Sequence, residues 1–68
     1  MSKREPSDDL AVWLRIRRAE LQLRQLDVAR RAGVSRFTVS RIERGHHAHP
    51  LVVAAIRRAL GEKEHEHG

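Results

Sequence analysis

Three glycines, at positions 33, 45 and 61, divide much of this 68-residue chain into short segments, and these segments have helical patterns. Apolar residues recur three and four positions apart, which is the spacing of one helix face, and no stretch alternates as a half-buried strand does. Glycine just after a helix readily takes the left-handed backbone that ends many helices. We therefore predict an all-α fold, a compact bundle of four short helices.

The first two expected helices lie before Gly33. Ser7 is expected to cap the first helix, with acidic residues in its first turn, where the helix dipole favours them. Residues 22–24 form a connection, and a second helix is expected at about residues 25–32. The apolar stripe predicted for the first helix consists of Leu10, Trp13, Leu14, Ile16 and Leu21.

The other two expected helices follow the same logic. Ser35 is a good N-cap for a third helix over about residues 36–44, and Val34 and Val39 have the spacing of a hydrophobic staple. Pro50 suits the first turn of a fourth helix, which stops at Gly61.

Length and composition limit the chain to one domain with a thin core. We expect residues 1–6 to be a flexible N-terminal arm, residues 7–61 to be the folded domain, and residues 62–68 to be a flexible polar tail. There is no cysteine, no apolar run near the ~20 residues that span a bilayer, and no secretory signal pattern. These features are typical of an intracellular protein without membrane contact.

The positive charge lies almost entirely in the expected domain. Residues 10–60 contain eleven arginines and three acidic residues, a net charge of +8. The planar guanidinium group suits phosphates and guanine edges better than the point charge of lysine does, and solvated faces usually mix both signs. The charge pattern therefore indicates a polyanionic partner.

The third expected helix has two contrasting faces when its residues are placed about 100° apart. Small or β-branched side chains, suited to packing, occupy one face, namely those of Ser35, Thr38, Val39 and Ile42. The cations and an aromatic ring occupy the other, namely those of Arg36, Phe37, Ser40, Arg41 and Arg44. We expect the first face to hold the domain together and the second to meet a partner.

The second and third helices also have helix-turn-helix spacing. Counted from Gln25, Ala29 is the fifth residue, where a small side chain lets the helices cross closely, and Gly33 is the ninth, in the turn. Val39 is the fifteenth and Ile42 the eighteenth, and both would fill the helix crossing.

With these features, the stretches LRIRRAELQLRQLDVARRAGVS, RFTVSRIERG and HPLVVAAIRRALG resemble the Cro/phage-repressor (XRE-type) helix-turn-helix family over about residues 10–61. The resemblance implies a lambda-repressor-like DNA-binding domain. It implies a transcription regulator, a repressor, that binds a double-stranded DNA operator and reads the major groove with residues 36–44. The protein would be cytoplasmic, of prokaryotic or phage origin, and would need no cofactor.

The resemblance also assigns roles to particular residues. The expected base-reading residues are Arg36, Phe37, Ser40 and Arg41. The expected contacts to the DNA backbone come from Arg24, Gln25, Ser35, Arg44 and His46. Arg18 and Glu43 correspond to a structural ion pair of the family.

The sequence departs from the family pattern in three ways. Arg24 replaces the usual capping serine or threonine, so the second helix loses a side-chain cap and gains a phosphate ligand. Gln22 replaces a common glycine, and the fifth helix of many relatives is absent.

The residues alone leave several roles open. Arg36 and Arg41 would either bind guanine O6 and N7 or be ordinary solvated or phosphate-binding arginines. Phe37 would pack on a thymine methyl group or fill a gap in the protein. Arg30 and Arg31 would contact phosphates or lie solvated on a far face.

The fourth helix has two apolar sides. Val53, Ile56 and Leu60 form an inward stripe, and the second side consists of Leu51, Val52, Ala55 and Ala59. We expect the second side to form a homodimer that places two recognition helices ~34 Å apart on one DNA face. The alternative is that the first helix or the N-terminal arm covers it.

Other functions have weaker support. The histidines at 46–49 and 65–67 lie in a loop and a tail without cysteine, so we expect no metal site. The sequence has no recognisable nucleophile–base pair, carboxylate pair or phosphate loop, so we do not expect an enzyme. Non-specific RNA binding usually exposes several stacking aromatics. The main alternative is an antitoxin or adapter of the same fold whose chief partner is a protein.

Overall fold

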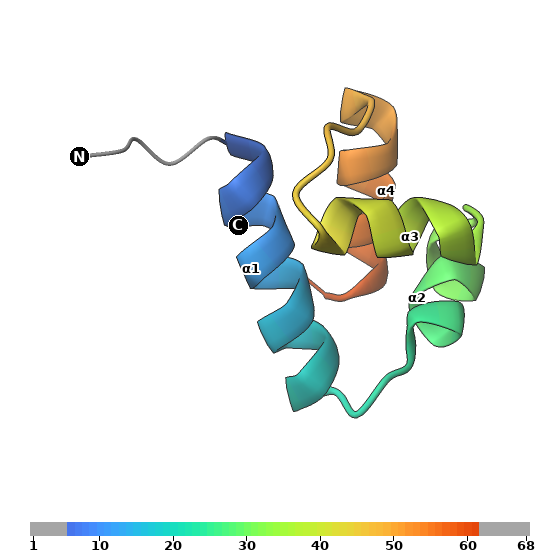
Figure 1. The fold of residues 1–68 in the computed structure, drawn as a ribbon. Helices are drawn as coiled ribbons and strands as arrows, with labels where there is room; N and C mark the ends of the chain where they lie inside the picture. The colour runs from blue at the N-terminus through green and yellow to red at the C-terminus, as the bar shows by residue number, and fades with distance from the viewer. Residues whose placement is uncertain (1–5, 62–68) are drawn as a thin grey trace, which may run out of the picture.

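This computed structural model describes residues 6–61, which contain four helices joined by short connections (Figure 1). They are α1 (Pro6–Glu20), α2 (Gln25–Ala32), α3 (Arg36–Glu43) and α4 (Pro50–Ala59). The predicted all-α fold is confirmed. The expected flexible tail and all but the last residue of the expected arm lie outside the described residues.

Two helix ends differ from the prediction. α1 begins at Pro6, two residues earlier than a cap at Ser7 would place it, so Ser7 lies within the helix and is not its N-cap; proline suits the first turn of a helix. α3 ends at Glu43 rather than at residue 44. The amides of Gly45 and His46 donate to the carbonyls of Ile42 and Arg41, at 2.9 and 3.0 Å, and this closes the last turn.

The turn between α2 and α3 has the predicted features. Gly33 has φ 74°, a left-handed conformation that costs glycine little. The amide of Val34 donates to the carbonyl of Ala29 (3.0 Å), and the Ser35 Oγ accepts from the amide of Thr38 (3.0 Å). These local bonds connect the two helices through only three residues.

Gln22 has a left-handed backbone conformation, with φ 57°. This conformation costs a non-glycine residue about 1–2 kcal/mol. The amide of Leu23 then donates to the carbonyl of Arg18 (2.9 Å), so the end of α1 closes normally. This turn therefore carries a backbone cost that glycine would not have.

The core lies where the four helices meet. In Figure 1, α3 crosses the middle of the molecule between α1 and α2, with α4 behind it. α1 packs on α3, and α2 packs on both α3 and α4. The apolar side chains buried at this junction are Leu10, Leu14, Val28, Ala29, Val39, Ile42, Ile56 and Leu60.

The predicted stripe of α1 is partly wrong. Leu10 and Leu14 are buried and Trp13 packs against the core, but Ile16 is 55 % exposed and Leu21 is 36 % exposed. Ile16 lies two positions from Leu14, which places it on the opposite side of the helix. Leu21 follows the last residue of α1 and so leaves the helical stripe.

One side of α4 faces the core, as expected, through Ile56 and Leu60. Val52, which we assigned to the second apolar side, instead packs against the core together with Val53. The free apolar surface of α4 is therefore smaller than predicted, although Leu51 is 74 % exposed. None of the helices in residues 6–61 is long and apolar enough to cross a membrane.

Candidate nucleic-acid interface

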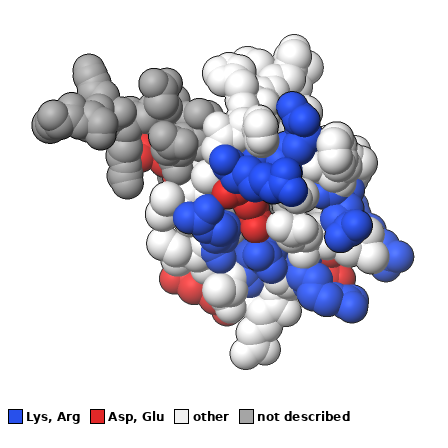
Figure 2. Space-filling model, viewed as in Figure 1, with Lys and Arg blue, Asp and Glu red and all other residues white. Residues whose placement is uncertain are grey.

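The structure separates the two faces of α3. Val39, Ile42 and Glu43 are buried against the other helices. The side chains on the outer face are exposed for Arg36, Phe37, Arg41 and Arg44 and half-buried for Ser40. Figure 2, which looks onto α3, shows basic side chains gathered on this side of the molecule. We call these five residues the outer face of α3.

Phe37 does not fill a gap in the protein, because 68 % of it is exposed. The guanidinium carbon of Arg41 lies 5.5 Å from the centroid of the Phe37 ring. This is the distance range of an attractive cation–π contact. An aromatic ring and a cation are thus held together on the outer face of α3.

A groove of ≈ 240 Å³ lies between α3 and the segment that leads into α4. Arg41 lines one side of it, with Thr38 and Ile42, and His47, Ala48, His49 and Val52 complete the lining. The Nδ1 atom of His49 accepts from the amide of Leu51 (3.0 Å) and so caps α4. Within residues 6–61, no three His, Cys, Asp or Glu side chains are grouped as metal ligands. The histidines at 65–67 lie outside the described residues.

Two arginines of α1 bind the ends of other helices, which the sequence analysis missed. Arg15 Nη1 donates to the carbonyl of Glu43 (2.8 Å), and Arg17 Nε donates to the carbonyl of Leu60 (3.0 Å). Terminal carbonyls lack partners within their own helix and carry partial negative charge. These cations therefore stabilise the fold, and no sequence signal marks a backbone carbonyl as their target.

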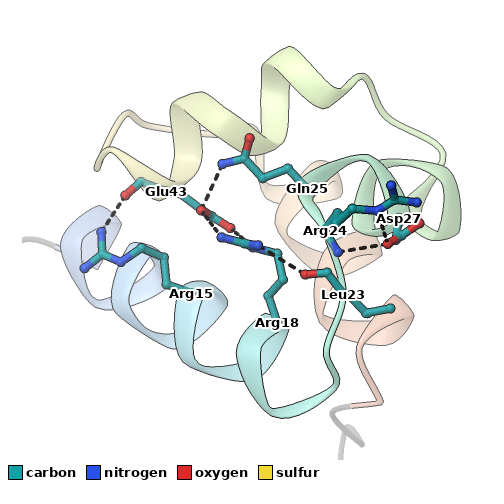
Figure 3. Close-up of polar contacts among 7 residues, drawn as sticks. All are labelled: Arg15, Arg18, Leu23, Arg24, Gln25, Asp27 and Glu43. Atoms are coloured by element: carbon teal, nitrogen blue, oxygen red, sulfur yellow. Dashed lines mark hydrogen bonds and ion pairs between the residues drawn. The ribbon is translucent and has the colours of Figure 1, made fainter.

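The Glu43 side chain joins three helices (Figure 3). It is only 6 % exposed. Arg18 donates to it twice, from Nε to Oε2 (2.6 Å) and from Nη2 to Oε1 (3.0 Å). Gln25 Nε2 donates to Oε1 (3.0 Å), and Arg18 Nη1 reaches the carbonyl of Leu23 (3.1 Å). We call Glu43, Arg18 and Gln25 the Glu43 network.

Gln25 therefore has a role that the sequence did not predict. The resemblance assigned it to the DNA backbone, whereas the structure directs its amide nitrogen to Glu43. A primary amide has two N–H bonds, so the second can still donate to a phosphate. Ser35 is similarly engaged: its hydroxyl caps α3 and lies 3.0 Å from the hydroxyl of Thr38.

The start of α2 combines an exposed cation with a fixed turn. Arg24 is the N-cap and makes no side-chain cap, as its residue type implies. Asp27 supplies the reciprocal contact, since its Oδ2 accepts from the Arg24 amide (2.9 Å) and from Nε (3.3 Å). The Arg24 side chain is still 80 % exposed. Arg30 and Arg31, in the last turn of α2, are exposed as well.

Asp27 should make stability depend on pH in the acid range. The Arg24 amide, and then the Arg24 guanidinium, hold the pKa of Asp27 below its ordinary value of 3.8. A lowered carboxyl pKa adds stability above the unfolded-state pKa, and this contribution is lost as pH falls through the folded-state pKa. We expect the melting temperature of Asp27→Asn to fall less steeply between about pH 4 and pH 2 than that of the wild type. Parallel slopes in thermal melts would show that Asp27 contributes nothing here.

The exposed outer face of α3, joined to α2 by a tight turn, defines the class of this protein as a helix-turn-helix domain. The sequence matches the family model described as a helix-turn-helix domain over residues 9–67, most of the chain. The chain belongs to this family of DNA-binding domains, as the sequence resemblance predicted. Members of such families are typically not enzymes. No curated protein matches the sequence.

Proposed function

We propose that the protein is a sequence-specific transcription regulator of the Cro/phage-repressor type, and that it represses by binding a double-stranded DNA operator. One observation carries this proposal. α3 buries Val39 and Ile42 in the core, and on the other side the helix and its C-cap Arg44 expose three arginines and a phenylalanine. A buried inner face fixes the helix rigidly, and a rigid cationic helix fits the major groove, which is about 12 Å wide.

Base reading is assigned to the outer face of α3. Arg36 and Arg41 have the fork geometry that binds guanine O6 and N7, a contact worth about 1–3 kcal/mol of discrimination. Ser40 lies between them along the helix and offers a hydroxyl group to either type of base pair. The Glu43 network supports this reading by tying α3 to α1 and α2.

Backbone contacts are assigned to the rim of this surface. Arg24 and Arg44 are exposed cations at the start of α2 and the end of α3. Gln25 is the first residue of α2, Ser35 caps the start of α3, and His46 follows the end of α3. Phosphate contacts set the position of a protein on DNA and carry no sequence information directly.

We also propose that the protein binds DNA as a homodimer through α4. Leu51 is 74 % exposed, and Val52, Ala55 and Ala59 are half-buried beside it or further along α4. A large exposed leucine on a small domain favours a partner surface. A two-fold dimer would place two copies of α3 ~34 Å apart, one DNA turn.

Two arginine substitutions test the DNA proposal. Arg41→Ala should relax base preference at one operator position by about 1–3 kcal/mol. Arg24→Ala should weaken binding to all DNA sequences alike and reduce the slope of log K against log salt by about 1. The measurements are selection of sites from random duplexes, and then titrations of the selected duplex at several salt concentrations.

Arg58→Ala is the control for the DNA contacts, because it removes an exposed arginine that is assigned neither to bases nor to phosphates, although it lies on the side of α4 assigned to the dimer. Arg58→Ala should leave unchanged both the preferred bases and the operator positions at which they are preferred. If Arg41→Ala and Arg24→Ala had the same effect on every sequence, the division into base and backbone contacts would be wrong. A selected site without two-fold symmetry would contradict the dimer.

The exposure of Leu51 also favours a second candidate, an antitoxin or adapter whose chief partner is another protein. Purification from the native host distinguishes the two. A stoichiometric partner of different sequence would support the adapter, and a dimer of this chain alone would support the operator-binding regulator.

A further inference from the structure

Phe37 is costly to expose in a chain of this composition. The chain has one tryptophan and one phenylalanine, and Trp13 packs against the core while Phe37 is 68 % exposed. The only described contact that engages its ring is the Arg41 guanidinium, 5.5 Å from the ring centroid. Phe37 and Arg41 are four residues apart, so they are neighbours on one side of α3.

The ring gives Arg41 a defined place. A free arginine side chain samples many rotamers, and ordering it opposes binding. Arg41 also lines the groove that contains His47 and His49, so open space lies beside its side chain. Stacking on the ring favours the position on the outer face. Phe37 is therefore a positioning residue for Arg41.

The ring also has a contact of its own to make. A phenyl group has no hydrogen-bond donor or acceptor, so the C5-methyl of thymine is the feature of a base edge that it can recognise. Successive bases on a strand are about 3.4 Å apart along the helix axis. The ring and the guanidinium are therefore close enough to reach neighbouring base pairs.

We infer that Phe37 and Arg41 form one reading unit that selects a 5-methylpyrimidine in the base pair next to a guanine. The Phe37 ring packs on the methyl group while the Arg41 fork binds guanine O6 and N7. This inference rests on the proposed function, since it requires α3 to lie in the major groove. It adds that the unit reads the methyl group itself, so 5-methylcytosine replaces thymine at this position and unmethylated cytosine does not.

The test uses the duplex that the wild-type protein selects from a random pool. The selected site should have a thymine in the pair next to the guanine whose recognition is lost in Arg41→Ala. Exchanging that thymine for deoxyuridine removes one methyl group, and the affinity of the wild type should fall by about fourfold. Exchanging the pair for 5-methylcytosine–guanine should preserve affinity, and cytosine–guanine should not.

Substitutions of Phe37 separate the two roles of the ring. Phe37→Ala should abolish the deoxyuridine effect. It should also weaken discrimination against 7-deazaguanine, which lacks the N7 atom that accepts a hydrogen bond from Arg41. Phe37→Leu should keep part of the deoxyuridine effect, because leucine packs on a methyl group. It should nevertheless lose guanine discrimination, because leucine has no π-face. Phe37→Tyr should restore both effects.

The possible failures are distinguishable. A deoxyuridine effect of the same size in the wild type and in Phe37→Ala would overturn the inference, since thermodynamic coupling is the signature of a contact. So would a selected site without thymine beside the guanine, although the proposed function would then survive. If the wild type selected no sequence at all, the proposed function itself would be overturned.

Discussion

Replacing Glu43 with alanine is expected to lower the free energy of unfolding by about 3–5 kcal/mol. The Glu43 carboxylate is buried and accepts hydrogen bonds from Arg18 and Gln25. Without it, the Arg18 guanidinium retains only the Leu23 carbonyl among these contacts. An uncompensated charge would then lie between three helices. Folded domains are stable by only about 5–15 kcal/mol, so urea denaturation followed by circular dichroism would resolve this loss.

Glu20→Ala is the matched control for Glu43→Ala. Glu20 also pairs with an arginine, Arg17, at 3.2 Å, but its side chain is 58 % exposed. Exposed pairs contribute about 0–1 kcal/mol. Glu43→Gln should have an intermediate effect, because the amide oxygen can still accept one of the Arg18 bonds. Equal losses for Glu43→Ala and Glu20→Ala would mean that the Glu43 network does not stabilise the helix arrangement.

Replacing Ile42 with alanine should cost about 2–5 kcal/mol of stability. Ile42 is 1 % exposed and lies on the buried face of α3. Its truncation removes apolar contacts and leaves a cavity under the helix that carries the proposed DNA contacts. The expected result is a markedly lower melting temperature. Affinity for DNA should also fall at temperatures where the variant is still folded, because α3 is no longer held rigidly.

Ile16→Ala provides the same chemical change at an exposed site. Ile16 is 55 % exposed, and substitutions at such positions usually change stability by no more than about 0.5 kcal/mol. The pair of variants therefore tests the position of the core directly. If Ile16→Ala were the more destabilising, the predicted stripe of α1 would be right in including Ile16 and the observed packing would be wrong.

The fold and the helix-turn-helix register were predictable because their signals are local. A cap such as Ser35 acts on an amide three residues away, and Gly33 ends a helix through its own φ angle. The periodicity of residues 36–44 likewise determines which side chains share a face of α3. The expected partners Arg18 and Glu43 came from the family resemblance, and the structure brings them together. The role of the outer face of α3 in DNA binding stays a prediction.

Amino-acid order by itself determined where the helices form, how α3 is capped and which side of α3 is cationic, because backbone conformation and helical periodicity depend on residues within a few positions. Tertiary structure alone decided that Arg15 and Arg17 bind helix-end carbonyls, that Gln25 joins Glu43, and that Ile16 stays in solvent. Each of these outcomes depends on which helices lie against α1 or α2. That arrangement comes from the joint burial of apolar groups that are far apart in the chain, which no local pattern encodes.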